Sequence, residues 1–145
     1  MAPLLLFIAW IVMIVLFIVN LQRTIALISP HIRKIDPGTA WIILFPFIGS
    51  IWQIAFAKKL ATYIELELKE RGIPIKPQPT YLAGLWSGIS NIVMILAAFM
   101  HLGIITSLLA FAPLILMIVY WVQVAQFKKV LKNSAPHILP QKFNL

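Results

Sequence analysis

The sequence predicts an all-α polytopic membrane protein with four transmembrane helices. Of its 145 residues, 61% are hydrophobic and only 11% are charged, whereas soluble domains are about 45–50% apolar and roughly 25% charged. The apolar residues gather in long runs separated by short basic or proline-containing segments. Because lipid is the solvent that accommodates such runs, we expect residues 1–145 to form a single transmembrane domain.

The first predicted span covers residues 3–28. It carries no charge before Arg23, and at about 1.5 Å per residue its first part nearly crosses a hydrocarbon core of ~30 Å. Arg23 can reach the lipid headgroups from the end of this segment. Pro30 then ends the helix.

The second predicted span covers residues 39–57 and continues to residue 71. Pro46 and Gly49 interrupt its apolar run, which predicts a helix that is kinked or broken near Pro46. Residues 58–71 favour helix and place apolar residues on one side. We therefore expect an amphipathic cytoplasmic helix with an apolar stripe formed by Leu60, Tyr63, Ile64 and Leu68.

The last two predicted spans cover residues 81–100 and 104–127. Only three residues separate them, so we expect an antiparallel hairpin. Pro113 predicts a kink in the fourth span, because proline removes one backbone hydrogen bond of a helix. A proline-containing tail, residues 128–145, follows.

The basic residues predict the orientation. Of the 12 lysines and arginines, none lies in the turn at 101–103, five lie in 58–79 and four lie after residue 127. Cytoplasmic loops are enriched in these residues, so the C-terminus is expected to be cytoplasmic. If 39–57 is instead re-entrant, all 12 lie on the cytoplasmic side; we favour four full spans, because re-entrant backbone needs protein cover. Anionic lipid headgroups are expected at Lys58, Lys59, Lys128, Lys129 and Lys132.

A small and polar face in the third span predicts close helix packing. It consists of Gly84, Ser87, Gly88 and Asn91, and small residues allow membrane helices to approach closely. The face is expected to contact another helix of the same chain, with a second protein or a second copy as the alternative.

Catalytic, metal and cofactor sites are not predicted. There is no cysteine, and in 39–57 and 81–127 the only titratable side chain besides the tyrosines is that of His101. Buried acids, bases or histidines are what proton relays use, and no pair of nucleophile and base is recognisable. The histidines lie in or beside loops, and the basic excess between apolar runs indicates headgroup contact rather than nucleic-acid binding.

The chain resembles a group of small, uncharacterised bacterial multi-pass membrane proteins over roughly residues 33–130. The matching features are Pro37-Gly38 before Trp41, the Pro46-Phe47 break before Trp52-Gln53, then Glu70-Arg71-Gly72 and Tyr120-Trp121. The chain has Gly49-Ser50 where that group more often has asparagine. The resemblance implies a bacterial inner membrane and a break at Pro46, and it implies no activity.

Two functions fit these features. The first is a non-catalytic membrane subunit or accessory protein that packs against a larger complex or copies of itself and presents residues 58–71 to a cytoplasmic partner. The second is a homo-oligomeric channel or carrier for a neutral or weakly polar solute, with Pro46 and the face at Ser87, Ser90 and Asn91 forming its pathway. An enzyme is disfavoured because no catalytic pair is present.

Overall fold

The computed structural model describes residues 2–101 and 103–134, and this part of the chain is helical with no strand. Three stretches are long and apolar enough to cross a membrane: Ile8–Ala26, Tyr81–Phe99 and Ile104–Asn133. The all-helical fold predicted from the sequence is therefore confirmed. The fourth predicted span, over 39–57, is not confirmed, because those residues do not form one long helix.

Helix α1 (Ala2–Ala26) forms from the first apolar run. Its last turns contain four polar residues (Asn20, Gln22, Arg23 and Thr24), and the Thr24 hydroxyl donates to the Asn20 carbonyl at 2.8 Å. The helix ends two residues before the predicted limit, where the Leu27 N–H bonds to the Thr24 carbonyl in a tighter turn. The connection that follows covers residues 27–36 and ends at Asp36.

Residues 37–70 form two helices joined at Phe45, which we call the η1–α2 hairpin. The 3₁₀ helix η1 (Pro37–Leu44) begins after Asp36, whose carboxylate accepts from the Gly38 N–H at 2.6 Å. Phe45 is extended (φ −75°, ψ 127°), and α2 (Pro46–Glu70) starts with its proline in the first turn. Proline is favoured there because the first turn has no internal partner for its missing N–H.

Hydrogen bonds and close contacts between residues on either side of Phe45 stabilise this hairpin. The Gly49 N–H donates to the Phe45 carbonyl at 2.7 Å, and the Trp52 indole N–H donates to the Thr39 carbonyl at 3.0 Å. A Cβ atom at Gly49 would lie 2.7 Å from the Ile43 carbonyl carbon and closer still to its oxygen. Glycine is therefore required where η1 crosses the start of α2.

Helices α3 (Tyr81–Phe99), α4 (Ile104–Leu109) and α5 (Phe111–Asn133) follow. The interruption in the last apolar run lies at Ala110, three residues before the predicted kink at Pro113. The position has a physical reason: Pro113 has no N–H to donate to the Leu109 carbonyl, so the helix restarts just before it. Helix α5 also continues beyond residue 127, through the lysines at 128, 129 and 132.

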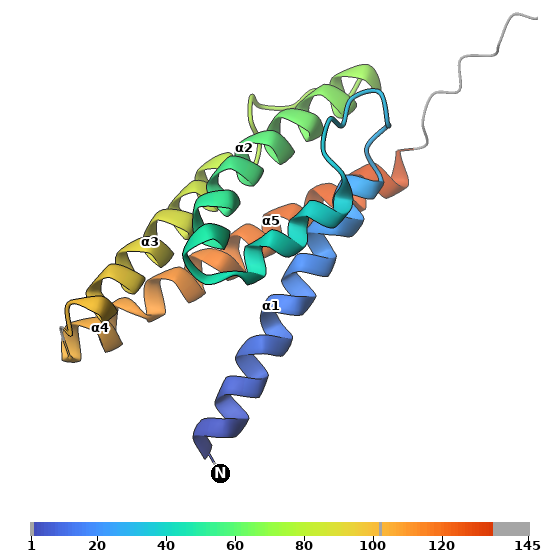
Figure 1. Cartoon of the computed structure of the whole chain (residues 1–145). Coiled ribbons are helices and arrows are strands. Elements are labelled where there is room, and N and C mark those ends of the chain that lie inside the picture. The colour runs from blue at the N-terminus through green and yellow to red at the C-terminus, as the bar shows by residue number, and fades with distance from the viewer. Residues whose placement is uncertain (1, 102, 135–145) are drawn as a thin grey trace, which may run out of the picture.

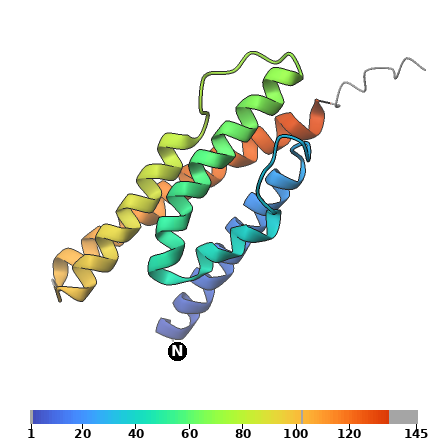
Figure 2. The same ribbon diagram turned by 45° about the horizontal axis from the view of Figure 1, so that its top comes forward.

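The C-terminal ends of α1, α2 and α5 lie together at one end of the bundle (Figure 1). Helix α3 starts farther back, beside the middle of α2, where Gly84 lies against Ala57. From this end η1 leads toward the middle of the bundle and α2 returns, an arrangement that is also visible after rotation (Figure 2). At the other end, the N-terminal half of α1 diverges from α3 and α4 (Figure 1).

The apolar stripe of α2 forms the core at the shared end. Leu60, Ile64 and Leu68 are almost completely buried and Tyr63 is 7% exposed. They belong to one cluster with Ile25, Ile28 and Ile32, from the end of α1 and the connection after it. The chain therefore covers this stripe with its own residues.

Candidate functional site

The glycines of α3 lie against α2. A Cβ atom at Gly84 would lie 2.5 Å from the Ala57 Cβ and 3.0 Å from the Tyr120 ring, and one at Gly88 would lie 2.5 Å from the Ile54 Cγ1. Helices α2 and α3 can therefore approach this closely only because neither position carries a side chain. The contact that these glycines permit is made within the chain.

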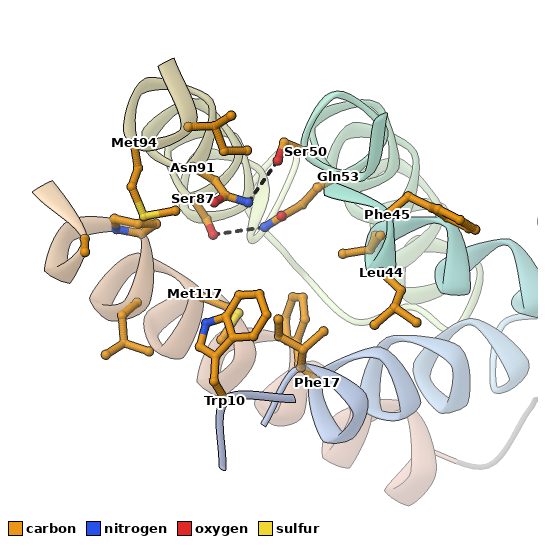
Figure 3. A pocket seen from close by; sticks show the side chains of 16 residues that line it. Trp10, Phe17, Leu44, Phe45, Ser50, Gln53, Ser87, Asn91, Met94 and Met117 are labelled. Atoms are coloured by element: carbon orange, nitrogen blue, oxygen red, sulfur yellow. Dashed lines mark hydrogen bonds between the residues drawn. The ribbon is translucent and has the colours of Figure 1, made fainter. Parts of the chain in front are cut away.

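Next to the glycines, four polar side chains meet between α2 and α3; we call Ser50, Gln53, Ser87 and Asn91 the polar quartet (Figure 3). The Gln53 Nε2 donates to the Ser87 Oγ at 2.9 Å, and the Asn91 Nδ2 donates to the Ser50 Oγ at 2.9 Å. Ser50, Ser87 and Gln53 are only 2%, 3% and 5% exposed. Ser50 and Gln53 lie three positions apart and Ser87 and Asn91 lie four apart, so each pair shares one side of its helix.

The polar quartet forms one wall of a cavity of about 190 Å³. The facing walls are apolar and come from α1, η1, α3 and α5 (Figure 3); among their residues are Trp10, Phe17, Leu44, Phe45, Met94 and Met117. No ionisable side chain is among the described residues that line it. The cavity is thus an apolar chamber with one neutral hydrogen-bonding wall.

The polar quartet retains unused hydrogen-bonding groups. Within the part of the chain that the structure describes, the Gln53 Oε1 and Asn91 Oδ1 accept no side-chain or backbone hydrogen bond, and the Ser50 and Ser87 hydroxyls act only as acceptors. An amide oxygen accepts and a hydroxyl also donates. The wall can therefore offer both donors and acceptors to a bound molecule.

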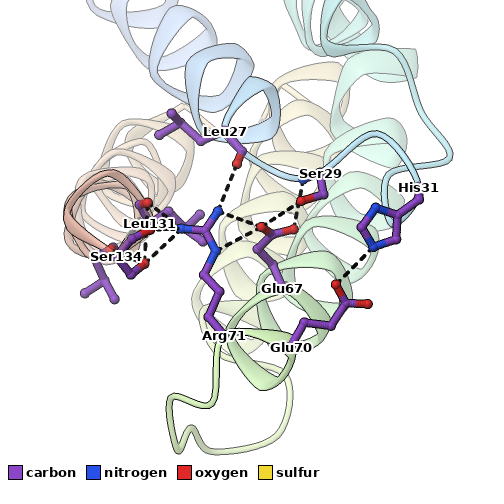
Figure 4. Close-up of polar contacts among 9 residues, drawn as sticks. Leu27, Ser29, His31, Glu67, Glu70, Arg71, Leu131 and Ser134 are labelled. Carbon is purple, nitrogen blue, oxygen red and sulfur yellow. Dashed lines mark hydrogen bonds and ion pairs between the residues drawn. The ribbon is translucent and has the colours of Figure 1, made fainter. Parts of the chain in front are cut away.

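A second polar cluster joins the ends of three helices (Figure 4). The Arg71 guanidinium donates to Glu67 Oε1 through Nε at 2.9 Å and through Nη2 at 2.6 Å. Its Nη1 donates to the Leu131 carbonyl at 2.6 Å and also to the Ser134 carbonyl, at the end of α5, and Nη2 reaches the Leu27 carbonyl at 3.5 Å. A cation at helix C-termini is favourable because the carbonyls there are unpaired.

Glu67 completes this cluster. Its carboxylate accepts from the Ser29 N–H at 2.8 Å and from the Ser29 hydroxyl at 2.9 Å. Burial raises the pKa of Glu67, but the hydrogen bonds from Ser29 and Arg71 outweigh it, and the pKa lies below its ordinary value. Glu67 and Arg71 are 3% and 8% exposed in their side chains, so this ion pair fixes α1, α2 and α5 relative to one another.

The predicted lipid-contact lysines lie on the surface or near it. Lys58, Lys59, Lys129 and Lys132 are exposed, and the Lys59 ammonium lies 5.4 Å from the Trp52 ring centroid. Lys128 is half-buried and donates to the Asn20 Oδ1. Four of the five side chains are thus free to reach headgroups.

Sequence analysis identified two of the four residues of the polar quartet, and it identified neither Glu67 nor Arg71 as part of a site. Ser87 and Asn91 were predicted as packing residues, whereas Ser50 was not, although it lies three residues before Gln53 on the same helix. Ser90, expected beside the pathway, donates instead to the Ser87 carbonyl at 3.0 Å and does not line the cavity. Glu67 and Arg71 were not predicted to form a site, because the sequence cannot show that Ser29 and Leu131 lie next to them in the fold.

The fold and the cavity define an all-helical protein with three helices suited to crossing a membrane and a neutral chamber between them. In comparisons with known proteins, no family model, curated protein or solved structure matches the chain. The function is therefore inferred from the geometry and chemistry of the cavity.

Proposed function

We propose that the chain is a non-catalytic integral membrane protein that binds a neutral, weakly polar molecule in the cavity beside the polar quartet. The observation that carries this proposal is the polar quartet itself. Two side-chain amides and two hydroxyls form one wall of an otherwise apolar cavity, and some of their hydrogen-bond donors and acceptors are unused. Ligand sites commonly combine apolar walls with a few placed polar groups.

The alternative, an accessory subunit, is supported less well by the described contacts. Its packing surface, Gly84 and Gly88, is occupied by α2, and the apolar stripe that would face a cytoplasmic partner is covered by the chain's own residues. Catalysis is also disfavoured, because Ser50 and Ser87 have no base among the described cavity residues to activate them. Ligand binding, unlike catalysis, requires no base, and the hydroxyls and amides of the polar quartet are sufficient for it.

We further propose that the membrane is crossed by α1, α3 and the helices α4 and α5, with the η1–α2 hairpin entering and leaving from the cytoplasmic side. The end of α1, the connection after it and the ends of α2 and α5 carry most of the basic residues of the described chain and lie at one end of the bundle (Figure 1), which agrees with the excess of lysine and arginine in cytoplasmic loops. Re-entrant backbone needs its polar groups satisfied, and at this turn the Phe45 N–H donates to the Ile42 carbonyl while the Phe45 carbonyl accepts from the Gly49 N–H. A bacterial inner membrane and a cytoplasmic C-terminus fit this arrangement.

Cysteine labelling tests this topology, because the chain has no native cysteine. We expect Ile35→Cys and Ile104→Cys to react with an impermeant maleimide from opposite sides of sealed vesicles. Four full spans would place both positions on the same side, so labelling of both from one side rejects the re-entrant arrangement.

The same method tests the binding cavity. We expect Asn91→Cys, in the cavity wall, to react with N-ethylmaleimide faster than Val93→Cys, on the exposed side of the same helix. The thiolate is the reactive form, and the hydroxyls and amide of the polar quartet can stabilise it at position 91, whereas hydrocarbon cannot do so at position 93. Equal rates at the two positions would mean that small neutral molecules do not reach the cavity, and the binding proposal would then be abandoned.

A further inference from the structure

We infer that the ligand is a lipid-soluble neutral ring compound that carries one hydroxyl or carbonyl group. This inference rests on the proposed binding function and names the chemical class of the ligand. It follows from three properties of the cavity: its size, the distribution of polar groups over its walls, and its lack of charge.

The size of the cavity selects a ring. Its volume is about 190 Å³, which is slightly more than the ~150 Å³ apolar cavity that holds benzene in an engineered protein. A single ring with one small substituent fills such a space. Two aromatic side chains, those of Trp10 and Phe17, line the same space (Figure 3) and can pack against a ring edge-on or offset.

The distribution of polar groups sets the orientation. All four members of the polar quartet lie on the wall between α2 and α3, and Trp10, Phe17 and Met117 lie across the cavity from it (Figure 3). A ligand with its polar group toward Asn91 and Gln53 and its ring toward Trp10 and Phe17 matches both walls. A hydroxyl or carbonyl would complete hydrogen bonds that the polar quartet leaves unused.

The lack of charge excludes ions. A buried charge without a partner costs several kcal/mol of desolvation, and the described cavity walls offer neutral amides and hydroxyls only. A carboxylate or ammonium of the same shape is therefore expected to stay outside. Trp10 and Leu44 line the cavity and are 50% and 47% exposed, which favours access from the lipid.

Fluorine NMR on the full chain in lipid nanodiscs tests this inference, with empty nanodiscs subtracting simple partition into lipid. The probes are para-fluorophenol, fluorobenzene and para-fluorobenzoate, which share a ring and differ in the polar group. One hydrogen bond corresponds to roughly a tenfold change in affinity. We expect para-fluorophenol to bind about tenfold more tightly than fluorobenzene, and para-fluorobenzoate to show no excess over empty nanodiscs.

Variants assign the effect to the polar quartet. The double variant Gln53→Leu, Asn91→Leu should weaken para-fluorophenol at least tenfold and leave fluorobenzene within about twofold. Ser90→Ala is the matched control, because Ser90 lies on the same helix but outside the cavity wall, and it should change neither. If the double variant does not fold, Ser50→Ala, Ser87→Ala removes the hydroxyls with little change in volume and is expected to weaken para-fluorophenol selectively.

Several results would overturn the inference. Equal binding of fluorobenzene and para-fluorophenol, excess binding of para-fluorobenzoate, or an unchanged para-fluorophenol affinity in the folded quartet variants would each do so. If no probe binds while Asn91→Cys reacts faster than Val93→Cys, the ligand class is wrong and the binding function stands. If Asn91→Cys also fails to react faster, the binding function fails with it.

Discussion

Gly49 is the position at which the η1–α2 hairpin depends most directly on one residue, and Gly49→Ala tests the hairpin. Alanine would place a Cβ atom 2.7 Å from the Ile43 carbonyl carbon and closer still to the carbonyl oxygen. Both are backbone atoms of η1, so no side-chain rotation relieves the overlap. The variant must open the hairpin, which also moves Ser50 and the cavity wall.

The magnitude follows from two opposing terms. Glycine to alanine inside a helix is normally stabilising by about 1 kcal/mol, whereas overpacking costs about 1–3 kcal/mol. Because the contact is with backbone, we expect the upper end of that range, which leaves a net loss of about 2 kcal/mol. For a chain of this size, that loss corresponds to a melting temperature lower by roughly 4–8 °C.

The assay is thermal unfolding followed by circular dichroism in mild detergent. Ala55→Gly is the control, because Ala55 is an exposed residue of the same helix and its replacement measures helix propensity alone, with an expected loss of about 1 kcal/mol. Helix propensity by itself predicts that Gly49→Ala raises the melting temperature. A variant as stable as the wild type, or more stable, would refute the close crossing of η1 and α2.

Three further predictions concern the contacts that hold the bundle. Arg71→Lys should lower the unfolding free energy by about 3 kcal/mol, because a lysine cannot reproduce the bonds to Glu67 and two helix ends; wild-type thermal stability would contradict this role. Stability should also fall as the pH drops below 4.5, the ordinary pKa of Glu67: its pKa is lower in the folded state, so the unfolded state takes up the proton first. The same titration on Glu67→Gln should show a shallower loss, and an equal loss would assign the effect to other groups. Gly84→Ala should cost about 2 kcal/mol through its 2.5 Å approach to Ala57, and Ala57→Gly in the same chain should restore part of that stability; strictly additive losses would exclude the contact.

Local sequence was sufficient to predict the helical class and most helix limits. Apolar runs determine which segments need lipid or a core, and this is why α1 and α3 begin and end within two residues of their predicted limits. The positions of the interruptions predicted from proline residues were less accurate. Pro113 predicted an interruption that lies three residues earlier, because the effect of proline falls on the carbonyl of the preceding turn.

The hairpin could not be derived from the sequence in the same way. Pro46 and Gly49 indicated a kink or a break, but a single broken span and a re-entrant hairpin have the same local signals. The difference lies in whether Gly49 faces lipid or the Ile43 backbone. That contact exists only once η1 turns back along α2.

The sequence by itself determined that this chain is a helical protein of membrane character with neutral spans, because hydrophobicity and charge are properties of individual residues. The tertiary structure alone decided which polar residues meet. Asn91 pairs with Ser50 across 41 positions, and Arg71 reaches Leu131 across 60. A hydrogen bond acts over about 3 Å, so such partners can be identified only when the folded chain has brought them together.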